Sequence, residues 1–546
     1  MYLLFPGRHL LNTQFQEQYL RSILRMPLQS LSYWNHPPAS QEELTELIFA
    51  VTSANQEHSR YNPVPFSVRS VGVDRFAADL KYSLGIKYRI LGIPHFPPNH
   101  QFAEMILKEI EEQTEGSLQL TPENTVVLCS TPAVCKLFDQ LGFAILPCEL
   151  GTEAATPSNV LKMFVEAGEN WQQSTAIRQF ISPATFSLWS DFEDTPRRIL
   201  RLWRDPLLTD DGGLTETRDY SSYSYGMSNP AILELKYQDI KTCIVEGKIV
   251  DEGCADGALL IPIARDFRDS DCIGIDITSE FIARCKERQR MGEYGDSFVF
   301  FHQRNLMDTI FQDHSIQTTI CNSTAHELWS YGNREITLHD YLHKKCKQTA
   351  KGGRIIIRDV VGPDQKDKMV WLWLNETDGR NHDWEAEFES NKELEEYLNG
   401  LSTFARFLRF SKDFLKHRKG TADTYQGIQY QFEKRNQETF AVLSLKDAAE
   451  FLSKKDYTDN WRSEMYEEFT FWDFQEWKNA LIKAGFQIVE NPNQPFNGSR
   501  AYPNEWVIQN RFAGKVALYT LVHEHLMPEP WFNTNMVLVG EKTASY

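Results

Sequence analysis

The sequence predicts an α/β protein with two doubly wound parallel sheets, one in each half of the chain, and a helical cap inserted into the second. Two series of short apolar runs, each run followed by a turn and a helical pattern, indicate this fold class. The length of 546 residues also exceeds what one ordinary core accommodates. We therefore expect a domain over residues 1–190, a linker over 191–230 and a second domain over 231–546.

The first domain is expected to hold five buried strands, because five apolar runs alternate with turns and amphipathic stretches. A strand that is followed by a helix and then by another strand favours a parallel sheet. The runs lie at residues 1–7, 46–54, 87–94, 125–131 and 143–149.

The second domain repeats this alternation. Its expected strands lie at residues 248–253, 272–277, 298–303, 318–323 and 352–360, and the pattern resumes near 481–491 and 536–542. The polar, mostly helical residues 364–455 interrupt it. An insertion at that point would lie over the carboxyl ends of the strands, so we expect it to act as a substrate cap.

Charge and composition narrow the classes of partner. A net charge of −18 argues against non-specific binding to nucleic acid or to an anionic membrane. The sequence contains no membrane-length apolar stretch and starts without a basic n-region, which favours the cytoplasm. Nine cysteines without a CxxC pair suggest neither a disulfide framework nor a zinc site, and no metal site is predicted. The oligomeric state stays open.

The stretch "KIVDEGCADGALL", residues 248–260, joins a strand to a helix through a glycine turn, an arrangement that binds nucleotides. A dinucleotide fold needs three glycines and a helix N-terminus open to a diphosphate. Here Asp251, Glu252 and Asp256 crowd the turn and would repel a diphosphate. A cationic ligand fits this turn better.

The same stretch resembles motif I of the Rossmann-like class I S-adenosylmethionine-dependent methyltransferases, with Asp251, Gly253 and Gly257 at the matching positions. Asp276, at the end of the next strand, matches the carboxylate that binds the ribose hydroxyls. Asn305 and Leu306 match the residues placed around the adenine. The resemblance implies that S-adenosyl-L-methionine is the cofactor.

The candidate catalytic residues are His326 and Glu327, which directly follow the fourth strand and would face the methyl group. A histidine that titrates near neutrality could accept the acceptor's proton. Alternatively, His326 caps the next helix or contacts the methionine moiety. Glu327 is the weaker candidate, because a carboxylate at this position also suits a solvated helix start.

Two aromatic segments allow two interpretations each. Residues 217–237 could fold over the site, with Tyr220 and Tyr223 on the cofactor and Arg218 and Tyr225 on the substrate, or pack on the sheet edge. The aromatic and basic stretch 404–420 could receive an anionic substrate, or form core with a solvated basic face.

Three fragments of the first domain, at residues 5–16, 51–69 and 174–178, are similar to motifs of nicotinamide-mononucleotide adenylyltransferase-like nucleotidyltransferases. In that family, paired histidines of the entrance loop hold the triphosphate, and Thr13 and Gln16 stand in their places here. His9, His58 and the phosphate-binding candidate Arg178 remain. The resemblance therefore implies a degenerate domain that binds a nucleotide or serves as a scaffold.

Together these patterns predict a methyltransferase that modifies a small molecule, possible substrates including nucleotide-derived ones, at oxygen or nitrogen. The fourth-strand motif "CNSTAHE" lacks the Asn/Asp-Pro-Pro-aromatic sequence that grips planar amino groups, so adenine-N6, cytosine-N4 and glutamine are not expected substrates. The alternatives are a bifunctional nucleotidyltransferase–methyltransferase, an RNA methyltransferase and a non-catalytic nucleotide-binding scaffold.

Overall fold

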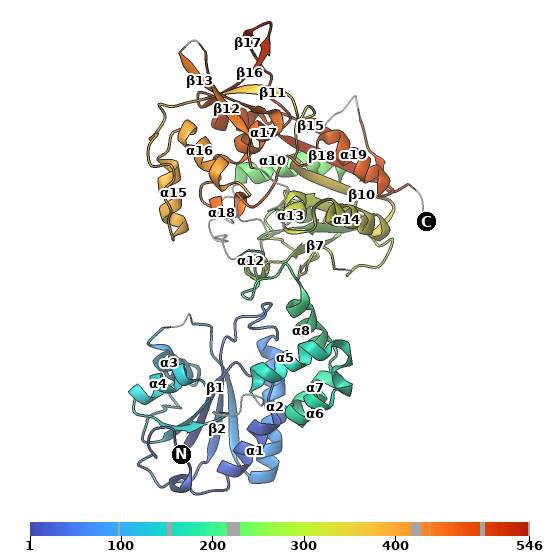
Figure 1. Ribbon diagram of the computed structural model, residues 1–546. Coiled ribbons are helices and arrows are strands. Elements are labelled where there is room, and N and C mark those ends of the chain that lie inside the picture. Colours follow the sequence, from blue (N-terminus) through green and yellow to red (C-terminus); the bar gives the residue numbers. More distant parts are fainter. Residues whose placement is uncertain are drawn as a thin grey trace. The chain divides into compact units, whose positions relative to one another are not determined.

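The computed structural model describes residues 1–96, 99–149, 156–215, 230–308, 310–415, 427–435, 437–491 and 497–543. The chain forms two compact units, Met1–Gly212 and Gly213–Tyr546, and each is described by itself (Figure 1). Within the described residues, no helix combines the length and the apolar character needed to cross a membrane.

The first unit is built on a parallel five-stranded sheet with the order β3-β2-β1-β4-β5, and all five predicted strands are present. Alternate residues of a strand face opposite sides of the sheet. Leu3 and Phe5 of β1 therefore pack toward α1 and α2, whereas Leu4 packs toward α3 and α4. The strands are β1 (Tyr2–Gly7), β2 (Glu46–Val51), β3 (Lys87–Gly92), β4 (Thr125–Cys129) and β5 (Ala144–Pro147).

Helices cover both faces of this sheet, as expected for a doubly wound fold (Figure 1). They are α1 (Gln14–Ile23), α2 (Phe66–Leu84), α3 (Phe102–Gln113) and α4 (Pro132–Gln140). The unit continues past the expected boundary at residue 190, because Ile199 and Leu200 of α8 join the core formed around Trp189. The helices of this core are α5 (Pro157–Ala167), α6 (Thr175–Phe180), α7 (Pro183–Asp191) and α8 (Asp194–Arg204).

The second unit contains a larger sheet with the order β14-β18-β10-β9-β6-β7-β8, in which β15 also pairs with β18. The five strands predicted from the sequence are parallel, and β18 runs antiparallel to β10. The strands are β6 (Lys248–Glu252), β7 (Asp271–Asp276), β8 (Val299–Gln303), β9 (Ile316–Asn322), β10 (Thr349–Val360), β14 (Gln487–Ile488), β15 (Arg500–Tyr502) and β18 (Asn535–Glu541).

This sheet too is covered on both faces, which confirms the predicted fold class. Ile355 and Ile357 of β10 pack with α13, α14 and α19, whereas Ile356 between them packs with α10, α11 and α12. The helices are α10 (Pro230–Ile240), α11 (Leu260–Asp266), α12 (Ser279–Arg290), α13 (Ala325–Tyr331), α14 (Arg334–Gln348) and α19 (Phe474–Lys483).

The insertion into this unit, here called the cap, contains strands as well as the expected helices. It consists of two pieces of chain, from β11 to α18 and from α20 to β17, which together form an antiparallel sheet with the order β12-β13-β11-β16-β17. Its strands are β11 (Met369–Leu374), β12 (Tyr430–Arg435), β13 (Glu438–Ser444), β16 (Val516–Val522) and β17 (His525–Pro528).

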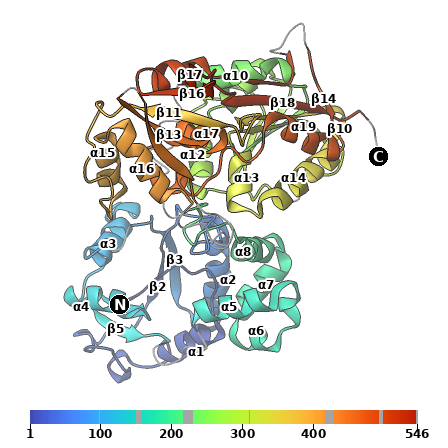
Figure 2. The ribbon, with the colours of Figure 1, turned by 45° about the horizontal axis from the view of Figure 1, so that its top comes forward.

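The cap helices are α15 (Asn391–Asn399), α16 (Thr403–Asp413), α17 (Leu445–Lys454), α18 (Trp461–Glu464) and α20 (Glu505–Val507). In both views, α15 and α16 lie on the side of the cap remote from β18 (Figures 1 and 2).

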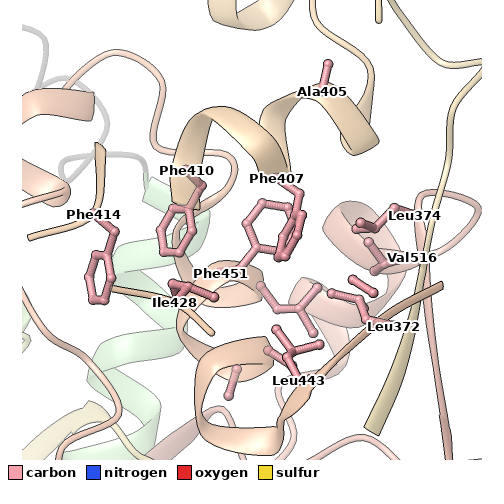
Figure 3. Packing of buried hydrophobic residues seen from close by; sticks show 14 of the residues in the cluster. Leu372, Leu374, Ala405, Phe407, Phe410, Phe414, Ile428, Leu443, Phe451 and Val516 are labelled. Atoms are coloured by element: carbon pink, nitrogen blue, oxygen red, sulfur yellow. The ribbon is translucent and has the colours of Figure 1, made fainter. Parts of the chain in front are cut away.

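The aromatic stretch that begins at residue 404 belongs to the core of the cap. Phe407 and Phe410 of α16 are fully buried against Phe451 of α17, with ring centroids 5.1 and 5.4 Å from that of Phe451 (Figure 3). Arg409 is buried as well, and its Nε donates to Asp413 at 2.5 Å. The described part of this stretch therefore supports the core interpretation and not an anion-binding surface. Residues 416–420 lie outside the described residues.

Candidate functional site

The turn after β6 requires glycine at two positions. Gly253 and Gly257 have φ values of 75° and 77°, in the left-handed region. A Cβ at Gly253 would lie 2.2 Å from Oγ1 of Thr324, and a Cβ at Gly257 would lie 2.5 Å from the hydroxyl of Tyr294. The bare backbone at Gly253 thus packs against the segment that follows β9, and that at Gly257 packs against Tyr294. The turn can keep this packing only while both residues are glycine.

The three carboxylates near this turn have different roles. Glu252 points away from Asp251, since neighbours in a strand alternate, and it binds Lys345 and accepts a 2.5 Å hydrogen bond from the Tyr341 hydroxyl. Asp256 forms an ion pair with Arg288 at 2.7 Å. The negative charge expected to crowd the turn is therefore partly neutralised, and the argument from charge against a diphosphate is weaker than the sequence indicated.

All three carboxylates are buried, and Asp251, which is 2% exposed, is the one for which the described residues show no ion pair. Burial raises its pKa to about 7, the charge of Asp276 adds to the rise, and Lys236 opposes it. Lys236 is buried too, and burial lowers its pKa to about 8. A carboxylate that is costly to ionise in the free protein is stabilised when a cation binds beside it.

Asp276 ends β7 and holds the glycine turn. Its Oδ2 accepts a hydrogen bond from the amide of Ala255 at 3.0 Å, and its Oδ1 accepts one from the amide of Thr278 at 2.8 Å. Burial raises the pKa of Asp276 to about 7, against the opposing effect of these two amides, and the charge of Glu327 adds to the rise.

Asn305 and Leu306 follow β8, which pairs with β7 so that Gln303 lies opposite Asp276. Asn305 Oδ1 accepts a hydrogen bond from the amide of Met307 at 2.9 Å, and Leu306 is buried in the core beneath the sheet edge. The structure therefore brings the glycine turn, Asp276 and these two residues to the carboxyl ends of three neighbouring strands. Tyr220, Tyr223, Arg218 and Tyr225 lie outside the described residues.

His326 lies in the first turn of α13 and is 7% exposed. Asp359, at the end of the neighbouring strand β10, binds it from one side: Oδ1 lies 2.7 Å from His326 Nδ1, and Oδ2 accepts from the amides of Ala325 and His326 at 2.8 and 3.3 Å. On the other side, Oε2 of Glu467 lies 3.5 Å from His326 Nε2.

These neighbours change the titration expected of His326. Burial by itself lowers the pKa of the imidazole, but the carboxylates of Asp359, Glu467 and Glu327 outweigh burial and raise it to about 9. The ring in the free protein is therefore protonated near neutrality and cannot accept a proton there, contrary to the expectation of a base that titrates near pH 7.

A cavity of about 450 Å³ lies between the sheet edge and the cap, and His326 and Asp359 are part of its wall. Arg511 of the cap lines it too, with its guanidinium 4.8 Å from the ring centroid of Tyr457. The remaining wall contains charged and aromatic side chains from both parts, among them Lys236, Asp239, Arg358, Asp456, Glu464, Phe469, Tyr502 and Trp506.

Sequence reasoning missed Asp359, Glu467 and Lys236. A signal existed for Asp359, because it ends a buried parallel strand as Asp251 and Asp276 do, at the sheet edge where ligands bind. Glu467 lies just after α18 of the cap, in an acidic and aromatic stretch that has no local pattern pointing to it. Lys236 precedes β6 on a helix and is not part of any matched motif.

In the first unit, the residues at the positions of the paired histidines bind each other. The Thr13 amide donates to Gln16 Oε1 at 2.9 Å, and the Gln16 amide donates to Thr13 Oγ1 at 3.1 Å, which is a capping box at the start of α1. Both side chains are buried. This pair therefore stabilises the helix end and offers no cationic group to a triphosphate.

The other candidates of the first unit have contacts of their own. His9 is buried against Phe5, its Nε2 lies 3.1 Å from the Phe5 carbonyl, and burial lowers its pKa to about 4, so the ring is neutral. His58 pairs with Glu57 at 2.9 Å. Arg178 is exposed on α6, where its Nε donates to the Gln172 carbonyl at 2.7 Å.

Comparisons with known proteins agree with this division of the chain. Residues 245–436 match the family model described as a methyltransferase domain, so the C-terminal part of the chain carries such a domain. Among curated proteins, the chain is similar to a nicotinamide-nucleotide adenylyltransferase from Archaeoglobus fulgidus, with 24% identity over 138 residues, 24% of this chain and 71% of that protein. The N-terminal part is thus nucleotidyltransferase-like.

Among solved structures, the chain is similar to the [4+2]-cyclase SpnF (16% identity, 25% of this chain, 49% of that chain, TM-score 0.21). It is also similar to a geranyl diphosphate C-methyltransferase from Streptomyces coelicolor (10% identity, 62% of this chain, 86% of that chain, TM-score 0.27). A third similar structure is a SAM-dependent methyltransferase from Methanosarcina mazei (12% identity, 55% of this chain, 94% of that chain, TM-score 0.26). The chain spans about half of the length of the cyclase.

Proposed function

We propose that the chain is an S-adenosylmethionine-dependent methyltransferase that acts on a small molecule at an oxygen or a nitrogen atom. The observation that carries this proposal is the hydrogen bond from Ala255 to Asp276, which joins the glycine turn and the ribose-binding candidate at one sheet edge. The carboxyl ends of β6, β7 and β9 meet at this edge, which the cavity adjoins through His326 and Asp359.

The residues present fit this cofactor. The turn at Gly253 and Gly257 packs closely against its neighbours and lies beside Asp276, whose carboxylate can accept hydrogen bonds from both ribose hydroxyls. Asp251 and Asp276 together favour a ligand with positive charge and no phosphate. When bound, S-adenosylmethionine supplies a methyl group on a sulfonium, and the chain's own task is then chiefly alignment.

The cavity supports a small acceptor. Its volume of about 450 Å³ falls in the range of small-molecule sites, and the cap covers the sheet edge where an RNA duplex would have to approach. We place His326 and Glu327 on the acceptor's side of the methyl group. Because the imidazole already carries a proton near neutrality, Glu327 is the candidate that can accept the acceptor's proton, and His326 orients the acceptor. Asp359 positions His326 through the bond to Nδ1.

For the first unit, we propose a nucleotide-binding or scaffolding role without nucleotidyl transfer. The capping box between Thr13 and Gln16 supports this proposal, because it ties up the two positions where the resembling family has its phosphate-stabilising histidines. Arg178 is the residue that could still contact a phosphate.

Calorimetry with the full chain tests the leading proposal. We expect saturable binding of S-adenosylmethionine and no binding of NAD at the same concentrations, followed by transfer of labelled methyl groups to an acceptor from a small-molecule extract. Binding of NAD in place of S-adenosylmethionine would reject the proposed cofactor. Transfer only to RNA would replace the small-molecule acceptor by the RNA alternative, and binding of neither cofactor would favour a scaffold.

A further inference from the structure

One imidazole and two carboxylates converge between the sheet and the cap. One ligand-type atom from each of His326, Glu327 and Glu467 lies within 4.8 Å of the other two, and no other such group of three is found among the described residues. His326 and Glu467 are buried, and Glu327 is half-buried. Two carboxylates in so little space are costly unless positive charge balances them.

The far atoms of the two buried side chains are already bound, so that their near atoms face each other. Asp359 binds Nδ1 of His326, and the hydroxyl of Tyr331 donates to Oε1 of Glu467 at 3.1 Å. Metal-binding histidines typically donate their second ring N–H to a carboxylate, and metal-binding carboxylates are hydrogen-bonded in turn. Both ligands here have such supporting partners.

The separation of the near atoms suits a shared cation. Nε2 of His326 and Oε2 of Glu467 lie 3.5 Å apart. Two ligands about 2.1 Å from a tetrahedral ion are about 3.4 Å apart. A single ion between these atoms would therefore need little movement of either side chain.

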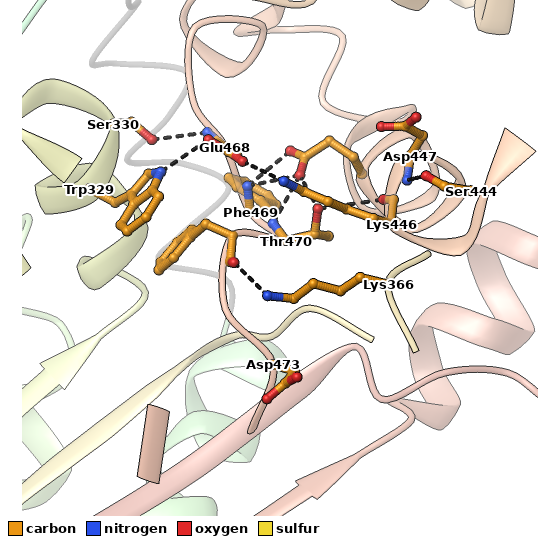
Figure 4. Close-up of polar contacts among 12 residues, drawn as sticks. Trp329, Ser330, Lys366, Ser444, Lys446, Asp447, Glu468, Phe469, Thr470 and Asp473 are labelled. Atoms are coloured by element: carbon orange, nitrogen blue, oxygen red, sulfur yellow. Dashed lines mark hydrogen bonds and ion pairs between the residues drawn. The ribbon is translucent and has the colours of Figure 1, made fainter. Parts of the chain in front are cut away.

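The segment that carries Glu467 is fixed from both sides (Figure 4). Toward α13, Glu468 accepts a hydrogen bond from Nε1 of Trp329 at 3.0 Å, and its amide donates to the Ser330 hydroxyl at 2.9 Å. Toward α17, the buried Glu450 accepts from the amides of Phe469 and Thr470 at 2.9 Å each. The position of Glu467 is thus set before any ligand arrives.

We propose that His326, Glu327 and Glu467 bind a divalent transition-metal ion that joins the cap to the methyltransferase sheet. Imidazole with carboxylates is a ligand set that suits Zn²⁺ and Mn²⁺. Three protein ligands leave a coordination position for water or substrate, and the cavity wall contains His326, so that position can face the acceptor. The inference deepens the proposed function: it assigns the acceptor an oxygen atom that can bind the ion, and it gives His326 the role of a metal ligand.

The test uses the full chain without an affinity tag, freed of metal by a chelator and titrated by calorimetry with ZnCl₂ and with MnCl₂. We expect one ion per chain for at least one of the two metals. Affinity should fall at least tenfold in His326→Ala and in Glu467→Gln. His339→Ala is the matched control, because His339 pairs with Glu335 at 3.4 Å on α14, away from the cluster, and its removal should leave binding unchanged.

Absence of saturable binding of both ions to the wild-type chain would overturn the proposal, and so would equal binding in the wild type and the two variants. Circular dichroism reports whether the variants fold. If either does not, Glu327→Gln, on the half-buried ligand, replaces it and must show the same loss. S-adenosylmethionine is titrated into the same metal-free samples: cofactor binding without metal binding rejects the metal site and leaves the proposed function standing.

Discussion

Oδ2 of Asp276 accepts a hydrogen bond from the backbone amide of Ala255 at 3.0 Å, so the side chain that ends β7 holds the turn that follows β6. The same carboxylate is the one expected to bind the ribose. If it binds the ribose as proposed, one side chain would contact both the glycine turn and the ligand.

Replacing Asp276 by Ala is expected to weaken binding of S-adenosylmethionine at least tenfold, or about 1.4 kcal/mol, because the ribose loses charge-assisted hydrogen bonds and the turn loses its anchor. Calorimetry measures the change. Asp271→Asn is the matched control, since Asp271 lies exposed at the start of the same strand. Unchanged affinity in Asp276→Ala would reject this cofactor site.

Cofactor binding should depend on pH. Burial raises the pKa of Asp276 from 3.8 to about 7, and that of Asp251 similarly, so both carboxyls are largely protonated below pH 7 in the free protein. Only the ionised forms attract a cationic ligand. Affinity should therefore rise between pH 6 and pH 8, by no more than tenfold per pH unit for each carboxyl that ionises on binding.

The measurement is calorimetry at several pH values across that window. In Asp276→Asn, which cannot ionise, the dependence should be shallower and the remaining slope should come from Asp251. A pH-independent affinity in the wild type would mean that both carboxyls are already ionised before the ligand binds.

Replacing His326 by Ala is expected to lower turnover by roughly 10²–10⁴-fold and to leave affinity for S-adenosylmethionine nearly intact, because the residue is proposed to act on the acceptor's side. Single-turnover kinetics separates the two effects. His339→Ala should retain wild-type turnover. If His326→Ala instead loses cofactor binding while turnover at saturation is normal, His326 is a cofactor contact and not part of the acceptor site.

The first unit is expected to release no pyrophosphate above background when the chain is incubated with ATP or CTP and a panel of mononucleotides. Thr13 and Gln16 supply a capping box at the positions where the resembling family has its paired histidines. A coupled pyrophosphate assay measures the release. Robust release that disappears in Arg178→Ala would show that the unit is catalytic and would favour the bifunctional alternative.

The two main sheets could be predicted because their strands are continuous apolar runs, and burial on both faces leaves a local signature in the sequence. The antiparallel sheet of the cap could not be predicted from the sequence. The run at 369–374 is short and lies among polar residues, and its neighbour β16 is distant in the chain. Short strands whose pairing is non-local carry too little periodicity to distinguish them from loops.

In the candidate site too, features with a local sequence pattern could be predicted, and features that depend on distant residues could not. The glycine turn at Gly253 and Gly257 could be predicted from the motif, and both residues have the left-handed backbone that favours glycine. The cofactor-binding role of these residues and of Asp276 stays a prediction. The ion-pair partners of the other two carboxylates could not be predicted. Arg288 of α12 neutralises Asp256 and Lys345 of α14 neutralises Glu252, and both partners are distant in the sequence. Charge counted along the sequence overestimates charge in space wherever distant residues form ion pairs.

The cap is made of two pieces of chain, and β11 is the strand on which they meet: Trp371 lies opposite Val442 on one side and opposite Tyr519 on the other. During synthesis on the ribosome, the first piece emerges long before β16 does. Until then β11 is an exposed sheet edge, with a row of unsatisfied backbone groups beside apolar side chains. Nascent chains of this protein are thus open to mispairing between the synthesis of β11 and that of β16, and expression with slow elongation or without chaperones should produce aggregates seeded at residues 369–374.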